Sequence, residues 1–322
     1  MKLSYSLGSL LSINDLLNCA QKLSRRNVEA LWVPETWGME NFSMLSAVSQ
    51  KIDSAKIGSS IINIYSRSPV LIAMGAATID TISNKRLILG LGTSSIPIVE
   101  DLHGYKFEKP LRRMQEYVEI IRLALSGKKI DYTGEIFSLK GFTLLIKPPR
   151  QDIPIYLAAI NQKMVELTWK MADGAIFYLR PISEMKKTIA KMQTKRKIDV
   201  ACQFITCISK DEKKAKERAK KTVAFYVSVG EIYRRFLAEN GFREGVTNIH
   251  EEYLKSGFRS NHEHVTDSML ESLTICGLPN QAKEQLARIY DAGITHPIVQ
   301  FNPIGNTNES FDLLTSTLSD VN

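Results

Sequence analysis

Apolar residues along the chain form short strand-like runs that alternate with stretches of helical spacing. Eight runs have the length and composition of buried strands: residues 2–7, 28–34, 56–62, 86–92, 153–159, 174–179, 200–209 and 296–301. Apolar residues at helical spacing predict helices between them, at residues 13–23, around 44–48, 70–82, 112–125, 162–172, 183–195 and 280–294. Eight strands that alternate with helices predict an α/β fold, a (β/α)8 TIM barrel.

An open, doubly wound sheet is the alternative fold, because it also alternates strands with helices. That fold commonly carries a G-x-G-x-x-G phosphate-binding motif directly after its first strand. The corresponding stretch here, "SLGSLLS" at residues 6–12, lacks the motif. The sequence therefore favours the barrel.

Two stretches are too long to be plain connections between a strand and a helix. They span about residues 93–152, where "DYTGEIFSL" has hairpin character, and about residues 222–275. We expect both at the C-terminal face of the strands, where barrel enzymes build their active sites. The predicted organisation is a single barrel domain over residues 1–322 with these two insertions.

The net charge of +8 is compatible with a nucleic acid, a membrane surface or a small anionic ligand as partner. Much of the excess lies at residues 186–197 and 210–221, which are typical of solvent-exposed helix faces. Recognisable nucleic-acid modules are absent, as is any apolar run of about 18 residues. The four scattered cysteines suit a reducing compartment. We therefore expect a cytoplasmic protein with a small-molecule substrate and no nucleic-acid or membrane partner.

Polar residues follow several of the predicted strands, where barrel enzymes place their functional groups. These candidates are Glu35, Asn63, Arg67, Thr93, Ser94, Asn161 and Gln162. Glu35 is either a catalytic carboxylate or an ion-pair partner, and Arg67 is either an anion ligand or a structural clamp. Asn161 and Gln162 either cap the helix that follows or hold a phosphate at its N-terminus.

Other kinds of catalytic machinery find little support in the sequence. His262 and His264 are two residues apart without a firm helix, so we predict no metal site. No G-x-S-x-G motif is present. The strand ends are thus better suited to holding a cofactor that brings its own chemistry.

Six segments resemble the bacterial-luciferase-like superfamily, and most closely its coenzyme F420-dependent branch, which includes methylenetetrahydromethanopterin reductase. The segments are "ALWVPETWG", "KIGSSIINIYSRSP", "TIDTISNKRLILGLGTSS", "EKPLRRMQEYVEIIRLALSGKKIDYTGEIFSL", "IPIYLAAINQKMVELTWKMADGAIF" and "GLPNQAKEQLARIYDAGITHPIVQF". Together they cover nearly the whole chain. Departures from the family pattern occur at "NIYSRSP", at "AAINQ" and at Thr36–Trp37 after the strand-two acid.

The resemblance implies a barrel that binds a flavin or deazaflavin at the C-terminal face of its strands. It implies a non-prolyl cis peptide at Ser60–Ile61 behind the ring, and contacts from Asn63 to the ring or its side chain. Glu35 occupies the family's acidic position beside the ring. The implied cofactor-tail and phosphate contacts are Thr93, Ser94, Ala159, Ile160, Asn161 and Gln162.

The function expected from the resemblance is hydride transfer between coenzyme F420 and a small organic substrate, with a methylene-tetrahydropterin as one candidate. Two alternatives stay open: an FMN-dependent monooxygenase, and a flavin-binding barrel without turnover. The resemblance also implies a homodimer or a homotetramer.

Overall fold

Parallel strands and helices alternate along the chain in the computed structural model, which describes residues 2–8 and 10–318. Contacts divide the chain into two units, one of residues 20–176 and one of residues 1–19 with 177–322. Helix α1 (Ile13–Leu23) and strand β9 (Gly174–Tyr178) each contain a unit boundary. The single domain expected from the sequence stays a prediction.

The unit of residues 20–176 is built on a parallel sheet with the strand order β2-β3-β5-β8-β9. Besides β9, the strands of this sheet are β2 (Ala30–Val33), β3 (Lys56–Ser59), β4 (Ile62–Asn63), β5 (Leu87–Gly92) and β8 (Ile155–Ala158). Its helices are α2 (Asn41–Ser49), α3 (Pro69–Ile82), the π-helical turn η1 (Ile98–Leu102), α4 (Pro110–Leu125) and α5 (Gln162–Met171). All residues of β2 and β5 are buried, as expected for strands of a parallel sheet covered on both faces.

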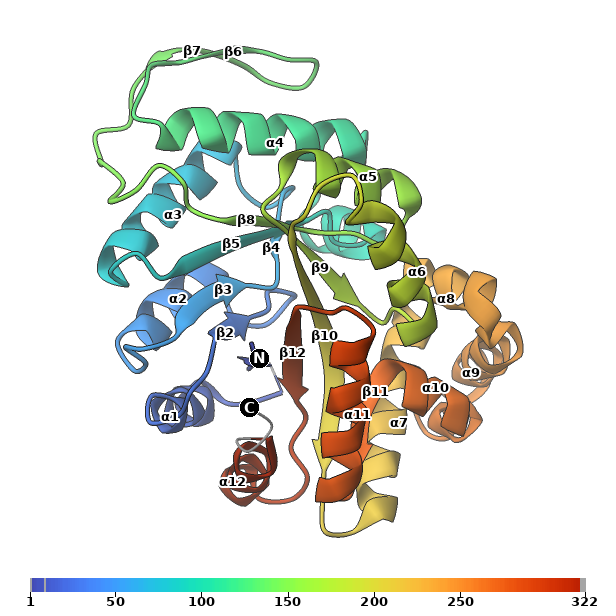
Figure 1. The fold of residues 1–322 in the computed structure, drawn as a ribbon. Helices are drawn as coiled ribbons and strands as arrows, with labels where there is room; N and C mark the ends of the chain where they lie inside the picture. The colour runs from blue at the N-terminus through green and yellow to red at the C-terminus, as the bar shows by residue number, and fades with distance from the viewer. Residues whose placement is uncertain (1, 9, 319–322) are drawn as a thin grey trace. The chain divides into compact units, whose positions relative to one another are not determined.

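The expected insertion at residues 93–152 contains three different structures. Turn η1 follows β5, helix α4 packs beside α3, and strands β6 (Ile130–Thr133) and β7 (Ser138–Phe142) form an antiparallel hairpin. Figure 1 shows this hairpin beyond α4. The hairpin prediction is confirmed. Because α4 packs along α3, much of this segment belongs to the helical layer rather than to the strand ends.

Hydrogen bonds to the carboxylate of Glu116, on α4, connect the hairpin to that helix. Glu116 is fully buried, and its oxygens accept the backbone N–H groups of Glu135 (2.7 Å), Ile136 (3.1 Å) and Phe137 (3.0 Å). Arg112 Nε also donates to it, at 2.7 Å. Burial opposes the charge of Glu116, but these donors outweigh it and lower its pKa below 4.5.

We expect Glu116→Gln to lower the free energy of unfolding of the hairpin by about 2 kcal/mol, since hydrogen bonds to a charged group are lost. Because the folded pKa is lowered, this contribution is present above pH 4.5 and is lost as the pH falls through the folded value. Hydrogen exchange at residues 135–137 measures both effects. Unchanged protection in the variant at pH 7 would contradict the anchoring role.

The second unit has a parallel sheet with the strand order β11-β10-β12-β1. Its strands are β1 (Ser4–Ser6), β10 (Asp199–Ile208), β11 (Thr274–Gly277) and β12 (His296–Phe301). Its helices are α6 (Ile182–Met192), α7 (Glu212–Val229), α8 (Glu231–Leu237), α9 (Arg243–Ser256), the 3-10 turn η3 (Asn261–His264), α10 (Asp267–Leu273), α11 (Pro279–Asp291) and α12 (Thr307–Leu318). Segment η2 (Ala238–Phe242) is a kink between α8 and α9, with non-helical backbone at Asn240 and Gly241. Strand β11 was not predicted from the sequence, because only four residues separate α10 from the turn before α11.

The expected insertion at residues 222–275 forms a helical cluster beside the C-terminal half of β10. Helices α7 to α10 enclose a set of buried apolar side chains: Val223, Val227, Leu237, Val246, Ile249, Met269, Leu270 and Leu273. Ile205 and Cys207 of β10 belong to the same cluster. The segment is therefore a packed structure with its own core.

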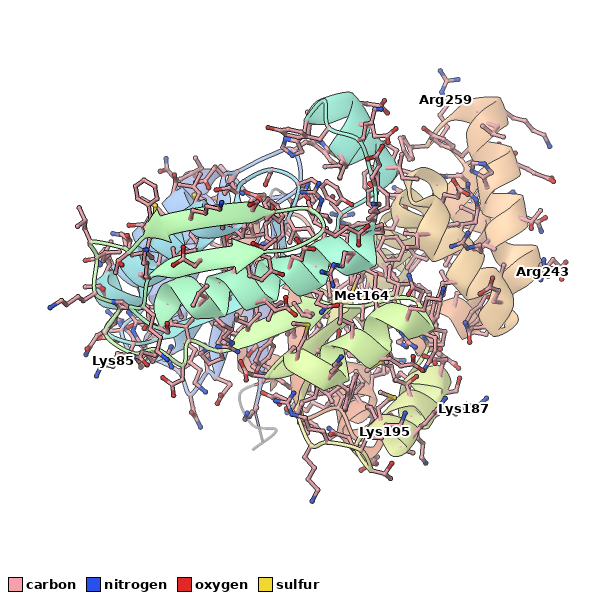
Figure 2. All side chains as sticks on the ribbon, turned by 90° about the horizontal axis from the view of Figure 1, so that it is seen from above. Lys85, Met164, Lys187, Lys195, Arg243 and Arg259 are labelled. Atoms are coloured by element: carbon pink, nitrogen blue, oxygen red, sulfur yellow. The ribbon has the colours of Figure 1, made fainter. Side chains whose placement is uncertain are left out.

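The basic segments are solvent-exposed helix faces, as predicted. Lys187 on α6 and Lys195 just after it are exposed, and Figure 2 shows their side chains directed outward. On α7, Lys216 and Lys221 pair with glutamates one helical turn away. Within residues 2–8 and 10–318, no helix combines the length and the apolar character needed to cross a bilayer.

Candidate active site

The predicted site residues of the unit 20–176 follow the carboxyl ends of neighbouring parallel strands. Register pairs join β2 to β3, β3 to β5, and β5 to β8, all parallel. Carboxyl ends of parallel strands lie at one edge of a sheet. The segments that follow these strands carry all ten predicted residues: Glu35, Ser60, Ile61, Asn63, Thr93, Ser94, Ala159, Ile160, Asn161 and Gln162.

The predicted third strand, residues 56–62, is broken in the structure. The peptide bond between Ser60 and Ile61 is cis, as the resemblance implied, and it separates β3 from β4. The break turns Ile61 toward β5, where an added Cβ at Gly92 would lie 2.5 Å from the Ile61 side chain. An added Cβ at Gly90 would lie 1.9 Å from the carbonyl oxygen of Ser59. Both glycines therefore make room for this break.

Two buried polar atoms beside the break lack a hydrogen-bond partner among the described residues. They are Oγ of Ser60 and Nδ2 of Asn63. The Asn63 amide is nevertheless oriented, because its Oδ1 accepts the backbone N–H of Tyr65 at 2.9 Å. An unpartnered buried donor costs about 1–3 kcal/mol, so these two atoms are available to a ligand or to a bound water.

Glu35 is held by a two-pronged ion pair with Arg67. Nη1 of Arg67 donates to Oε2 at 2.8 Å, and Nη2 donates to Oε1 at 2.6 Å. The side chains are only 12% and 13% exposed. Burial opposes the charge of Arg67, but hydrogen bonds and charges from Glu35 and Glu40 outweigh it and raise the pKa of the guanidinium. The ion pair considered for Glu35 and the clamp considered for Arg67 are present, and the catalytic role of Glu35 stays a prediction.

Three residues that support this pair were missed from the sequence. Glu40 caps α2 and also accepts from Arg67. The backbone N–H of Asn41 donates to Glu35 Oε1 at 3.1 Å. The hydroxyl of Tyr117, on α4, donates to the carbonyl of Arg67 at 2.6 Å. An acidic residue directly before the helix "NFSML" is a capping signal that would have found Glu40.

Arg113, also missed, is the second guanidinium near these strand ends. It lies over the ring of Tyr65 at 4.6 Å and over that of Phe137 at 5.6 Å. Tyr65 in turn stacks on Phe107, with ring centroids 5.3 Å apart. Burial raises the pKa of the Tyr65 hydroxyl, although the charge of Arg113 acts against this. The stack joins the segment after β4 to the one that precedes α4.

Asn161 caps the N-terminus of α5, which was one of the two roles considered for it from the sequence. Oδ1 of Asn161 accepts the backbone N–H of Met164 at 3.0 Å. The backbone N–H of Ala159 is already bonded to the carbonyl of Ile176, so it offers nothing to a ligand. The N–H groups of Gln162 and Lys163, in the first turn, make no hydrogen bond to the described residues. They are the donors that an anion would find here.

Thr93 and Ser94 follow β5 and are partly buried. Ser94 has a positive φ of 59°, an unusual conformation for a residue other than glycine. Their assignment to the cofactor tail stays a prediction. In the described part of the chain, no three histidine, cysteine or acidic side chains gather as a metal site would require.

Comparisons with known proteins agree with this architecture. Residues 3–296 match the family model described as luciferase-like monooxygenase. The chain is 33% identical over 288 residues to a 5,10-methylenetetrahydromethanopterin reductase of Archaeoglobus fulgidus, a match that covers 85% of each protein.

Two solved structures resemble the fold. One is a coenzyme F420-dependent tetrahydromethanopterin reductase from Methanopyrus kandleri, with a TM-score of 0.84 and 22% identity over 97% of this chain and 96% of the other. The other is an F420-dependent secondary alcohol dehydrogenase in complex with an F420–acetone adduct, with a TM-score of 0.80 and 17% identity over 100% and 99%. The predicted (β/α)8 barrel is confirmed, and the chain belongs to the luciferase-like monooxygenase family.

Proposed function

We propose that this chain is a coenzyme F420-dependent oxidoreductase that transfers a hydride between the deazaflavin and a small organic substrate. The similarity to the Archaeoglobus fulgidus reductase, over 85% of both chains, is the observation that carries the proposal. It makes a methylene-tetrahydropterin the first substrate to test. A homodimer or homotetramer and a cytoplasmic location stay predictions.

The residues at the strand ends fit a deazaflavin cofactor. Nδ2 of Asn63 and Oγ of Ser60 are buried polar groups without a partner among the described residues, and both can donate to ring carbonyls. The free N–H groups of Gln162 and Lys163 suit a phosphate in the cofactor's tail. Bound F420 would supply the hydride from the central ring of the deazaflavin.

Glu35 is the proposed catalytic residue beside the ring. Arg67 fixes both of its oxygens, and the Asn41 N–H adds a second donor to Oε1. Among the described residues, Oε2 receives one hydrogen bond, so one acceptor position remains on that oxygen. A carboxylate held in this way is oriented to hold or move a proton at the substrate or to stabilise positive charge on it.

The substitution Asn161→Asp separates helix capping from anion binding. An aspartate side chain keeps an acceptor for the Met164 N–H, so the free energy of unfolding should change by less than about 0.5 kcal/mol. The added negative charge should weaken F420 binding by about tenfold if the phosphate lies at this terminus. Quenching of F420 fluorescence measures the affinity. Affinity equal to that of the unmodified protein would place the phosphate elsewhere.

An FMN-dependent monooxygenase is the second candidate, favoured by the description of the family itself. Oxidation of reduced F420 without oxygen consumption supports the first function. Oxygen uptake with reduced FMN supports the second. A protein that binds either cofactor and turns over neither would be the non-catalytic barrel.

A further inference from the structure

One face of the sheet in the second unit is polar. Register pairs join Ser4 to Ile298 and Ser6 to Gln300 across β1 and β12, and Gln203 to Ile298 across β10 and β12. Paired residues of parallel strands share a face, as do residues two apart on one strand. Ser4, Ser6, Gln203, Gln300 and His296 therefore lie on the same face.

The opposite face of this sheet is apolar and covered. Tyr5 of β1 and Phe301 of β12 contact Phe311 of α12, with ring centroids 6.3 and 5.1 Å apart. Tyr5 and Phe301 alternate with Ser4, Ser6 and Gln300, so the polar residues point away from α12. The serines and glutamines are thus not part of the packing between sheet and helix.

Two groups on the polar face are buried without a partner. Ser6 is 1% exposed and Gln203 is 8% exposed, yet Oγ of Ser6 and Oε1 of Gln203 make no hydrogen bond to the described residues. Leaving such atoms unpaired costs about 1–3 kcal/mol each. Both lie in the middle of the sheet, where a serine or glutamine could be exchanged for an apolar residue without loss of backbone pairing.

Gln300 is the third polar side chain beside Ser6 and Gln203, and a hydrogen bond fixes the orientation of its amide. Its Oε1 accepts the hydroxyl of Tyr178 at 2.8 Å, so its Nε2 is directed away from that oxygen and donates to none of the described residues. Tyr178 packs edge-on against Tyr226 and Tyr233, with centroids 4.9 and 5.8 Å away, which holds the phenol in place. Strand spacings put the α-carbons of Ser6, Gln203 and Gln300 within about 12 Å of one another.

The chemistry of Ser6, Gln203 and Gln300 indicates which class of ligand could bind to them. The three groups are neutral and include both donors and acceptors. By register and alternation, the face also carries Ala201, Ile205 and Ile298. Its ionisable groups are His296 and Asp199, which bond each other at the other end of the strands, and the buried thiol of Cys207. A carboxamide is complementary to an N–H group beside a C=O group, as in a lactam or ureide ring.

We propose that Ser6, Gln203 and Gln300 bind the lactam-like edge of a neutral, flat ring in the organic substrate. The proposal rests on the proposed function, because it assigns these residues to the substrate of that oxidoreductase. Substrate specificity would then follow from hydrogen bonds that an apolar ring cannot make.

Pterin, a fluorescent bicyclic ring with a lactam edge, is the probe that tests this assignment. We expect Ser6→Ala and Gln203→Met to weaken pterin binding by about tenfold each, the loss of one hydrogen bond to a ring. Neither should lower the thermal midpoint of unfolding, because each removes a buried atom that has no partner. Naphthalene, which lacks the lactam edge, should bind no better to the unmodified protein than to the variants.

Ser4→Ala is the matched control on the same strand and face. It breaks the 2.5 Å contact between Ser4 and His296, so it should lower the thermal midpoint and leave pterin affinity unchanged. Equal pterin affinity in the unmodified protein, Ser6→Ala and Gln203→Met would overturn the proposal and leave bound water as the partner of these atoms. This assay measures pterin binding without F420, so its failure is distinct from failure of F420-dependent turnover.

Discussion

Glu35→Gln is expected to lower kcat/KM for F420-dependent turnover by about 100-fold or more, the range typical for loss of a positioned acid or base. Glutamine has the shape of glutamate and retains one oxygen for Arg67 Nη2 and the Asn41 N–H, while its amide NH2 cannot accept the hydrogen bond that Nη1 of Arg67 gives to Oε2. Steady-state kinetics with reduced F420 and an identified substrate measures the effect. The dissociation constant of F420 should change much less than kcat.

Glu40→Gln is the matched control for this experiment. Glu40 contacts the same guanidinium but caps α2, and its side chain is 47% exposed. We expect its loss to leave kcat/KM within about threefold, since the Glu40 carboxylate is half-exposed and water screens its pairing with Arg67. Equal losses in the two variants would show that Glu35 acts only by positioning Arg67, and no loss in either would remove Glu35 from the mechanism.

Gly90→Ala should lower the free energy of unfolding by about 3 kcal/mol, the upper part of the range for overpacking. The added Cβ would lie 1.9 Å from the Ser59 carbonyl oxygen and 2.9 Å from the Ile176 side chain. Backbone cannot move aside as a flexible side chain can. Ser59 is also fixed by its own hydroxyl, which bonds the backbone N–H and the carbonyl of Gly90. Urea denaturation followed by circular dichroism gives the change.

Gly245→Ala serves as its control. That glycine lies in α9, and an added Cβ would meet Sδ of Met269 at 2.9 Å, near the flexible end of that side chain. Alanine is favoured over glycine in a helix by about 1 kcal/mol, so stability should be kept or raised. A Gly90→Ala protein as stable as this control would contradict the packing role given to Gly90.

The glycines of "LGLGTSS" show what a sequence pattern leaves undetermined. From the sequence alone, this pattern is compatible with a turn and with a seat for a phosphate or cofactor, and close approach of another strand also produces it. In the structure the close neighbours of Gly90 and Gly92 are Ser59 and Ile61, from the segment around the cis peptide. A distant segment of the chain decides such a contact, and one sequence does not contain that information.

The sequence predicts local structure correctly where a residue contacts others only a few positions away in the chain. The capping of α5 by Asn161 and the outward charges of α6 and α7 are of this kind. Glu35 and Arg67 were both singled out, yet their pairing spans 32 positions and was one interpretation among several. The polar residues of β1 and β10 are visible within apolar runs, but only the register places Ser6 and Gln203 on one face.

The central claim, that this family member uses a deazaflavin, is tested most directly by the affinity of the purified protein for F420 and for FMN. The net charge of +8 and the free donors at the start of α5 suit the longer anionic tail of F420. Equilibrium dialysis against each cofactor should give a dissociation constant about tenfold or more lower for F420, a difference of ~1.4 kcal/mol or more. Tighter binding of FMN than of F420 would contradict the account.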